Sequence, residues 1–88
     1  MTVDVAYKVK NISVNIRRIR EGKGYTQEYL AMKLGISQNA YSKIELGYTK
    51  ITLERLFQIA KIIEVEIVTL MGDTKPTLTV EQPRAVSL

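Results

Sequence analysis

Two short helical segments joined by a tight turn limit the folds open to this chain more than any other feature. Residues 27–34 and 38–46 carry apolar side chains at helical spacing, and each follows a good N-cap residue, Thr26 or Ser37. Gly35 comes directly after the first segment, where a glycine readily takes the left-handed conformation that ends a helix. The sequence therefore predicts two short helices that meet at an angle.

The remaining chain extends this helical pattern on both sides. Helices are expected at 13–21, at 53–63 after the N-cap Thr52, and at 66–71. The expected fold class is all-α, with five helices in one domain spanning 11–72 and a short irregular C-terminal tail. Residues 1–10 alternate weakly, which predicts a strand or a disordered N-terminal arm, and 73–88 show no helical period, which predicts a flexible tail or a dimerisation arm.

Size and composition exclude several classes of protein. The chain has 88 residues, enough for one compact core, and it contains neither cysteine nor histidine. It therefore lacks thiolate ligands and the commonest general base and metal ligand. No carboxylate pair, activated nucleophile or glycine-rich phosphate loop stands at mechanistic spacing, so we expect no enzyme, no metal and no cofactor. No apolar segment predicts secretion or membrane insertion, and a cytoplasmic location is expected.

Positive charge is concentrated in the first half of the chain. Residues 8–50 hold nine basic and three acidic side chains, a net charge of +6, and residues 51–88 hold four basic and five acidic, a net charge of −1. The first half is therefore a candidate for binding a polyanion. By charge alone, solubility would be an equally good explanation.

The second helix of the tight pair is suited to reading DNA. A helix fits the major groove of a duplex, and the residues at its N-terminal end come closest to the base edges. Gln38 and Asn39 stand there, and their amides can donate to and accept from adenine. Lys43, one turn later, can reach guanine or a phosphate. These three residues are the predicted base contacts, and the alternative is an ordinary solvated helix face.

Four short motifs together resemble the Cro/CI-type, or Xre-type, helix-turn-helix of phage repressors and bacterial regulators. They are Thr26-Gln27, Leu30-Ala31, Gly35-Ile36-Ser37-Gln38 and Ile44-Glu45-Leu46-Gly47, within about 15–71. The resemblance implies a five-helix, lambda-repressor-like domain that binds double-stranded DNA, is usually dimeric and regulates transcription. It also implies that the third helix reads bases through Gln38, Asn39 and Lys43.

The resemblance assigns roles to further residues. Arg20 and Glu45 occupy the positions of an inward ion pair between the first and third helices. Gln27 and Lys50 match phosphate-contact positions of the family, and the predicted phosphate contacts also include Ser42, Tyr48, Thr49 and Arg17. Arg17 is expected to act mainly through diffuse electrostatics, and Tyr48 either packs over the loop or binds a phosphate. Two positions depart from the family pattern: Tyr29 replaces an acidic capping residue, and Glu64 replaces a glycine at a helix end.

Apolar residues in excess of the core predict a homodimer. The candidate interface consists of Phe57, Ile62, Val68 and Met71, and the alternative is scattered apolar surface on a monomer. A dimer would place its recognition helices about 34 Å apart and would bind a palindromic operator. A second hypothesis is an antitoxin or other protein-binding module, which would contact a protein partner through 73–88.

Overall fold

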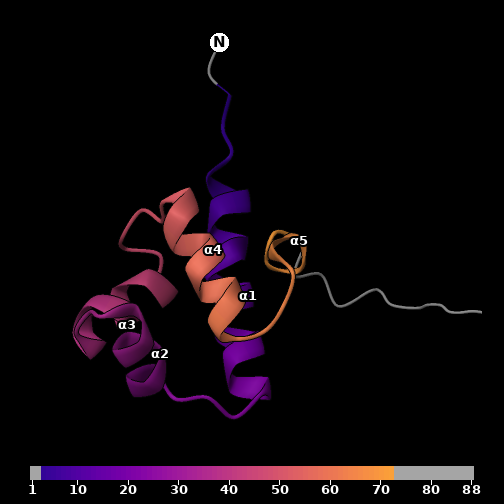
Figure 1. Cartoon of the computed structure of the whole chain (residues 1–88). Coiled ribbons are helices and arrows are strands. Elements are labelled where there is room, and N and C mark those ends of the chain that lie inside the picture. The colour runs from indigo at the N-terminus through magenta and orange to yellow at the C-terminus, as the bar shows by residue number, and fades with distance from the viewer. Residues whose placement is uncertain (1–2, 73–88) are drawn as a thin grey trace, which may run out of the picture.

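The computed structural model describes residues 3–72, and within that range the chain forms five α-helices and no strand (Figure 1). The helices are α1 (Ala6–Gly22), α2 (Gln27–Leu34), α3 (Gln38–Glu45), α4 (Leu53–Ile62) and α5 (Ile67–Leu70). The predicted all-α, five-helix fold is confirmed. The predicted bounds of the second to fifth helices agree with the structure to within two residues at each end.

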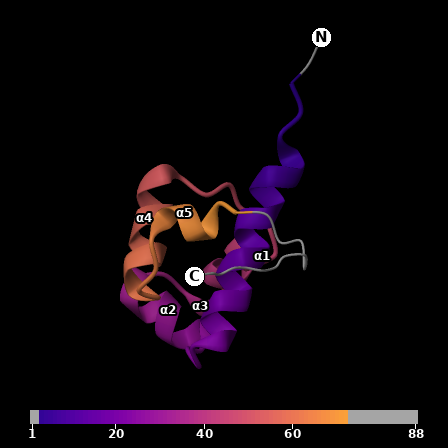
Figure 2. The same ribbon diagram turned by 90° about the vertical axis from the view of Figure 1, so that its right-hand side faces the viewer.

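The first helix begins much earlier than the sequence pattern indicated. It starts at Ala6, whose N–H donates to Asp4 Oδ1 at 3.0 Å, so the prediction of a strand or disordered arm is wrong for residues 6–10. The boundary expected at residue 10 falls inside this helix. Tyr7 and Val9 are exposed, and in Figure 2 the first turn of α1 lies to one side of the other helices. A helical segment that buries no face needs no helical apolar stripe.

Side-chain caps determine where three of the helices begin. A hydroxyl oxygen accepts a backbone N–H at the start of α2, α3 and α4, which satisfies one of the free donors of each first turn. The bonds run from Tyr29 to Thr26 (3.0 Å), from Ala40 to Ser37 (3.0 Å) and from Arg55 to Thr52 (3.1 Å). Gly35 ends α2 with a φ of 73°. The predicted caps are confirmed, and they keep the turn between α2 and α3 short.

All five helices contribute to one hydrophobic core. Its buried members are Ile16, Leu30, Ala31, Tyr41, Ile44, Leu56, Ile59, Ala60, Ile63 and Leu70. The short helix α5 is also tied to α1 by a buried amide: Asn15 Nδ2 donates to the carbonyl oxygens of Leu70 (2.9 Å) and Gly72 (2.7 Å). A helix of four residues has little stability of its own, so packing and these two bonds hold it in place.

The two departures from the family pattern are accommodated locally. Glu64 takes a positive φ of 61°, so the turn after α4 forms without a glycine, at a cost of about 1–2 kcal/mol in backbone strain. Lys23 Nζ donates to the Glu64 carbonyl oxygen at 3.2 Å, and Tyr25 Oη donates to Glu64 Oε1 at 3.4 Å. The charge of Glu64 raises the pKa of Tyr25. Tyr29 stacks on Tyr25 with the ring centroids 5.1 Å apart.

Candidate nucleic-acid interface

Helix α3 has a buried face and an exposed face. Tyr41, Ile44 and Glu45 are buried against the rest of the domain. The three predicted base contacts, Gln38, Asn39 and Lys43, are all exposed, and Ser42 between the two faces is half-buried. Gln38 and Asn39 are also the first two residues of the helix, directly after its capped end. The structure thus places these amides where a helix presents side chains to a groove.

An ion pair fixes the buried face of α3 to α1. Arg20 Nε donates to Glu45 Oε2 at 2.6 Å and Arg20 Nη2 donates to Glu45 Oε1 at 3.1 Å, so the pair is bidentate. The two side chains are only 8% and 2% exposed. Arg20 Nη1 also donates to the Tyr25 carbonyl oxygen at 2.7 Å, which ties the loop after α1 to the same cluster. The inward pair implied by the resemblance is present.

Two further donors complete the coordination of the Glu45 carboxylate. Tyr41 Oη donates to Glu45 Oε2 at 2.6 Å, and Gln27 Nε2 donates to Glu45 Oε1 at 3.1 Å. Burial by itself would raise the pKa of Glu45, but the hydrogen bonds from Arg20, Tyr41 and Gln27 and the charge of Arg20 outweigh it and lower this pKa below its ordinary 4.5. Burial, together with the bond to Glu45, raises the pKa of Tyr41. Glu45 is therefore a charged acceptor at neutral pH.

Sequence reasoning missed Tyr41 and Gln27 as partners of this carboxylate. The position of Tyr41 four residues before Glu45 was a usable signal, because residues at that spacing lie on one face of a helix. Gln27 offered no such signal, since the contact spans two helices. One of its side-chain N–H groups is directed inward to Glu45, while the first backbone N–H groups of α2 have no partner within the helix.

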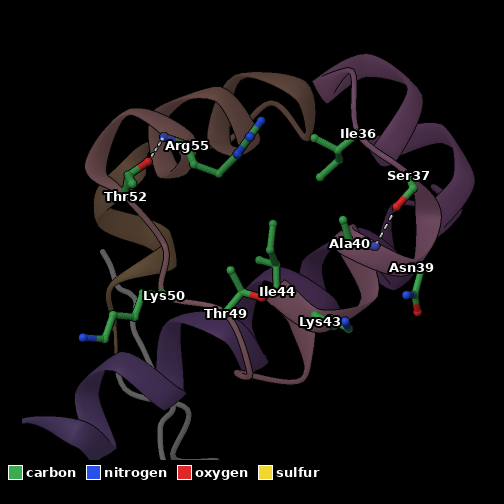
Figure 3. A pocket seen from close by; sticks show the side chains of 10 residues that line it. All are labelled: Ile36, Ser37, Asn39, Ala40, Lys43, Ile44, Thr49, Lys50, Thr52 and Arg55. Carbon is green, nitrogen blue, oxygen red and sulfur yellow. Dashed lines mark hydrogen bonds between the residues drawn. The ribbon is translucent and has the colours of Figure 1, made fainter.

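A hollow of about 480 Å³ lies between α3 and the start of α4 (Figure 3). Its rim brings two predicted base contacts, Asn39 and Lys43, next to the predicted phosphate contact Thr49. Lys50 also borders this space, but its side chain points away from it (Figure 3). Two of the residues expected to contact bases and two of those expected to contact the backbone thus border one hollow.

Arg55 lines the same hollow and was not singled out from the sequence. Its Nη1 donates to the Leu34 carbonyl oxygen at 3.5 Å and to Gln58 Oε1 at 3.3 Å. The first bond connects α4 to the C-terminal end of α2, just before the tight turn. Arg55 therefore braces the turn that positions α3, a role to which no sequence spacing pointed.

The other predicted phosphate contacts are accessible to different degrees. Tyr48 is 77% exposed, which excludes tight packing over the loop. Thr49 and Lys50 are exposed as well. Arg17 Nε forms an exposed ion pair with Glu21 Oε2 at 3.2 Å, one turn further along α1. A contact from Arg17 to a phosphate would compete with this surface pair.

The predicted dimer surface needs one revision. Phe57, Val68 and Met71 are exposed by 53%, 69% and 54%. Ile62 instead packs partly buried against the core, so the expectation that it lacks a core partner is wrong. Leu53, one turn before Phe57 on α4, is 65% exposed and was not predicted.

Two expectations concern other parts of the molecule. The protein-binding hypothesis involves residues 73–88, which lie outside the described residues. Over residues 3–72, every helix is too short or too polar to cross a membrane.

The helix-turn-helix arrangement is shared with known proteins. A family profile described as Helix-turn-helix matches residues 16–70. The chain is 34% identical over 68 residues to the uncharacterized HTH-type transcriptional regulator y4dJ of Sinorhizobium fredii, covering 77% of this chain and 88% of that protein. It is 36% identical over 55 residues to the uncharacterized HTH-type transcriptional regulator YqaE of Bacillus subtilis, covering 62% of this chain and 47% of that protein.

A longer relative and two solved structures add to this picture. The chain spans about a third of a second Sinorhizobium fredii regulator, y4dL, at 33% identity over 64 residues and 73% of this chain. The restriction-modification controller protein C.AhdI from Aeromonas hydrophila superposes with a TM-score of 0.66 and 28% identity, covering 74% of this chain and 97% of that one. The hypothetical transcription factor NHTF from Neisseria superposes with a TM-score of 0.69 and 23% identity, covering 84% of this chain and 86% of that one. This likeness is one of fold.

Proposed function

The chain belongs to the Cro/CI-type helix-turn-helix family of DNA-binding transcription regulators, and we propose that it binds a specific operator by inserting α3 into the major groove. In this proposal Gln38, Asn39 and Lys43 read base edges. Gln38 and Asn39 would pair with adenines, and Lys43 with a guanine or a phosphate.

One observation carries this proposal: the inward face of α3 is held by a buried ion pair while its outward face begins with two free amides. The bond of Arg20 to Glu45 and the cap at Ser37 set the direction and the start of the helix. Rigid placement favours base readout, because amide hydrogen bonds to a base edge require accurate geometry.

Contacts to the DNA backbone would set the register of the protein on the duplex. We assign them to Ser42 beside the base-reading face and to Tyr48, Thr49 and Lys50 in the loop after α3. At the start of α2 the contact would come from backbone N–H groups near Gln27, whose side chain bonds Glu45. Arg17 would add diffuse attraction to the DNA, and Glu21 would compete with a phosphate for its guanidinium group.

A symmetric homodimer would let two copies of α3 read successive turns of a palindromic operator, about 34 Å apart. The exposed apolar side chains of α4 and α5 support such an interface: Leu53, Phe57, Val68 and Met71. Occupancy of a promoter by such a dimer would repress transcription by exclusion. A DNA ligand would place the protein in the cytoplasm of a bacterial cell.

Selection of bound sequences from a random duplex pool tests the function. The wild-type protein is expected to enrich a palindrome, and Gln38→Ala is expected to lose the preference at one base pair of each half-site. Lys61→Ala is the control, because it removes an exposed side chain from the last turn of α4, on a different helix. Enrichment of no sequence by the wild type would refute operator binding. An unchanged motif for Gln38→Ala would remove Gln38 from the base contacts.

A further inference from the structure

The N-terminal turns of α1 form a second hollow with the loop after α3. These turns precede the residues matched by the family profile, which begin at 16. The hollow has a volume of about 640 Å³, and its walls come from Ala6 to Ser13 on one side and Gly47 to Lys50 on the other. Three of its loop residues, Tyr48, Thr49 and Lys50, are the proposed phosphate contacts.

The loop lies close to these first turns of α1. A Cβ built on Gly47 would lie 3.6 Å from Lys10 Cδ and 4.0 Å from Ser13 Oγ, so the aliphatic part of Lys10 passes close over the glycine. Gly47 has a φ of 79°, a conformation that suits glycine. The stem of Lys10 therefore lies beside the loop at Cδ, and the chain beyond it carries the ammonium group.

The chemistry of this hollow favours an anion. Lys10 and Lys50 line it, no carboxylate is among its lining residues, and within residues 3–72 neither lysine has an ion-pair partner. Tyr7 and Tyr48 are 62% and 77% exposed, so their hydroxyl groups are accessible as donors. The two lysines and two tyrosines that line this open space carry ammonium and hydroxyl groups, the kinds of donor that bind DNA phosphates.

We propose that this hollow binds a phosphate of the DNA backbone through Lys10, Lys50, Tyr7 and Tyr48, which extends the contact made by the loop. The inference rests on the proposed function, because it needs α3 on a duplex. Lys50 connects the two sites: it borders both hollows, and its side chain points away from the one beside α3 (Figure 3). The first turns of α1 would thus act as a second wall of the backbone clamp.

The salt dependence of binding to the selected operator duplex tests this proposal. Lys10→Ala is expected to reduce the slope of log affinity against log salt by about 1 per protomer, because one phosphate contact releases about one counterion. Lys61→Ala is the matched control. Lys61 is exposed in the last turn of α4 and lines neither hollow, so this variant should keep the wild-type slope. A wild-type slope for Lys10→Ala would overturn the inference.

Two further measurements separate the alternatives. Ethylation interference should identify one phosphate in each half-site whose modification weakens duplex binding by the wild type but not by Lys10→Ala. The absence of such a phosphate would contradict the inference. If Tyr7→Ala or Lys10→Ala lowers the dimer population in sedimentation while the slope stays at the wild-type value, the hollow binds a second copy of the chain and the inference is wrong. A wild-type protein that binds no duplex would refute the proposed function instead, so the two failures are distinguishable.

Discussion

The two faces of α3 differ in almost every physical property although they belong to one helix of eight residues. The inward face ends at Glu45, which accepts hydrogen bonds from Arg20, Tyr41 and Gln27 in a site almost closed to water. The outward face begins at Gln38 and Asn39, both exposed. Under the proposed function, the comparison assigns stability and recognition to different sides of the same helix, so each should be changeable without the other.

The largest expected effect comes from breaking the inward face. Glu45→Ala leaves the Arg20 guanidinium buried without its carboxylate and is expected to lower the free energy of unfolding by about 3–5 kcal/mol. Urea denaturation of both proteins measures it. A loss below about 1 kcal/mol would show that water reaches the pair and that the two faces differ less than their burial indicates.

Acid should remove part of the same stabilisation. The pKa of Glu45 lies below its ordinary 4.5 in the folded state, so the unfolded chain binds the proton more readily and stability rises with pH in that range. The stabilisation is full above about pH 4.5 and is lost as pH falls through the folded pKa. As pH is lowered from neutral, the free energy of unfolding of the wild type should approach that of Glu45→Ala. A constant gap down to strongly acidic pH would contradict this sign.

The outward face should show the reverse pattern. Asn39→Ala is expected to cost about 1–3 kcal/mol in discrimination between the operator and a single-base variant at the contacted position. Its free energy of unfolding should stay within about 0.5 kcal/mol of the wild type, because Asn39 is exposed. Competition binding and urea denaturation together give both values. A large loss of stability would mean that this face also supports the fold.

The smallest effect is expected at the exposed ion pair of α1. Arg17→Ala removes the bond to Glu21, in which the two side chains are 59% and 52% exposed, and should cost about 0.2–1 kcal/mol of stability. Arg17 lies one turn before Arg20 on the same helix, so Arg17→Ala and Glu45→Ala compare the loss of an exposed ion pair with the loss of a buried one. A loss equal to that of Glu45→Ala would show that exposure is not what separates them. Denaturation at low and high salt checks the expected screening.

Sequence reasoning succeeded where local chemistry decides the structure. Thr26, Ser37 and Thr52 cap their helices as expected, because a hydroxyl directly before an apolar-periodic segment satisfies a free N–H within the same turn. It failed at Ala6–Asn11, where the helix buries no apolar face and so leaves no periodic pattern. It also placed Ile62 on the surface, because core depth depends on how α4 packs, which spacing along the chain does not specify.

By itself the sequence determined the five-helix class, the tight turn between α2 and α3, and the amides that open α3, because caps, glycines and apolar spacing act over a few residues. Only the tertiary structure decided that Gln27 turns inward to Glu45, that Arg55 braces the end of α2, and that Lys10 lies against the loop after α3. Each of these arrangements joins residues at least 18 positions apart. Such contacts depend on the packing of whole helices, which no short stretch of sequence encodes.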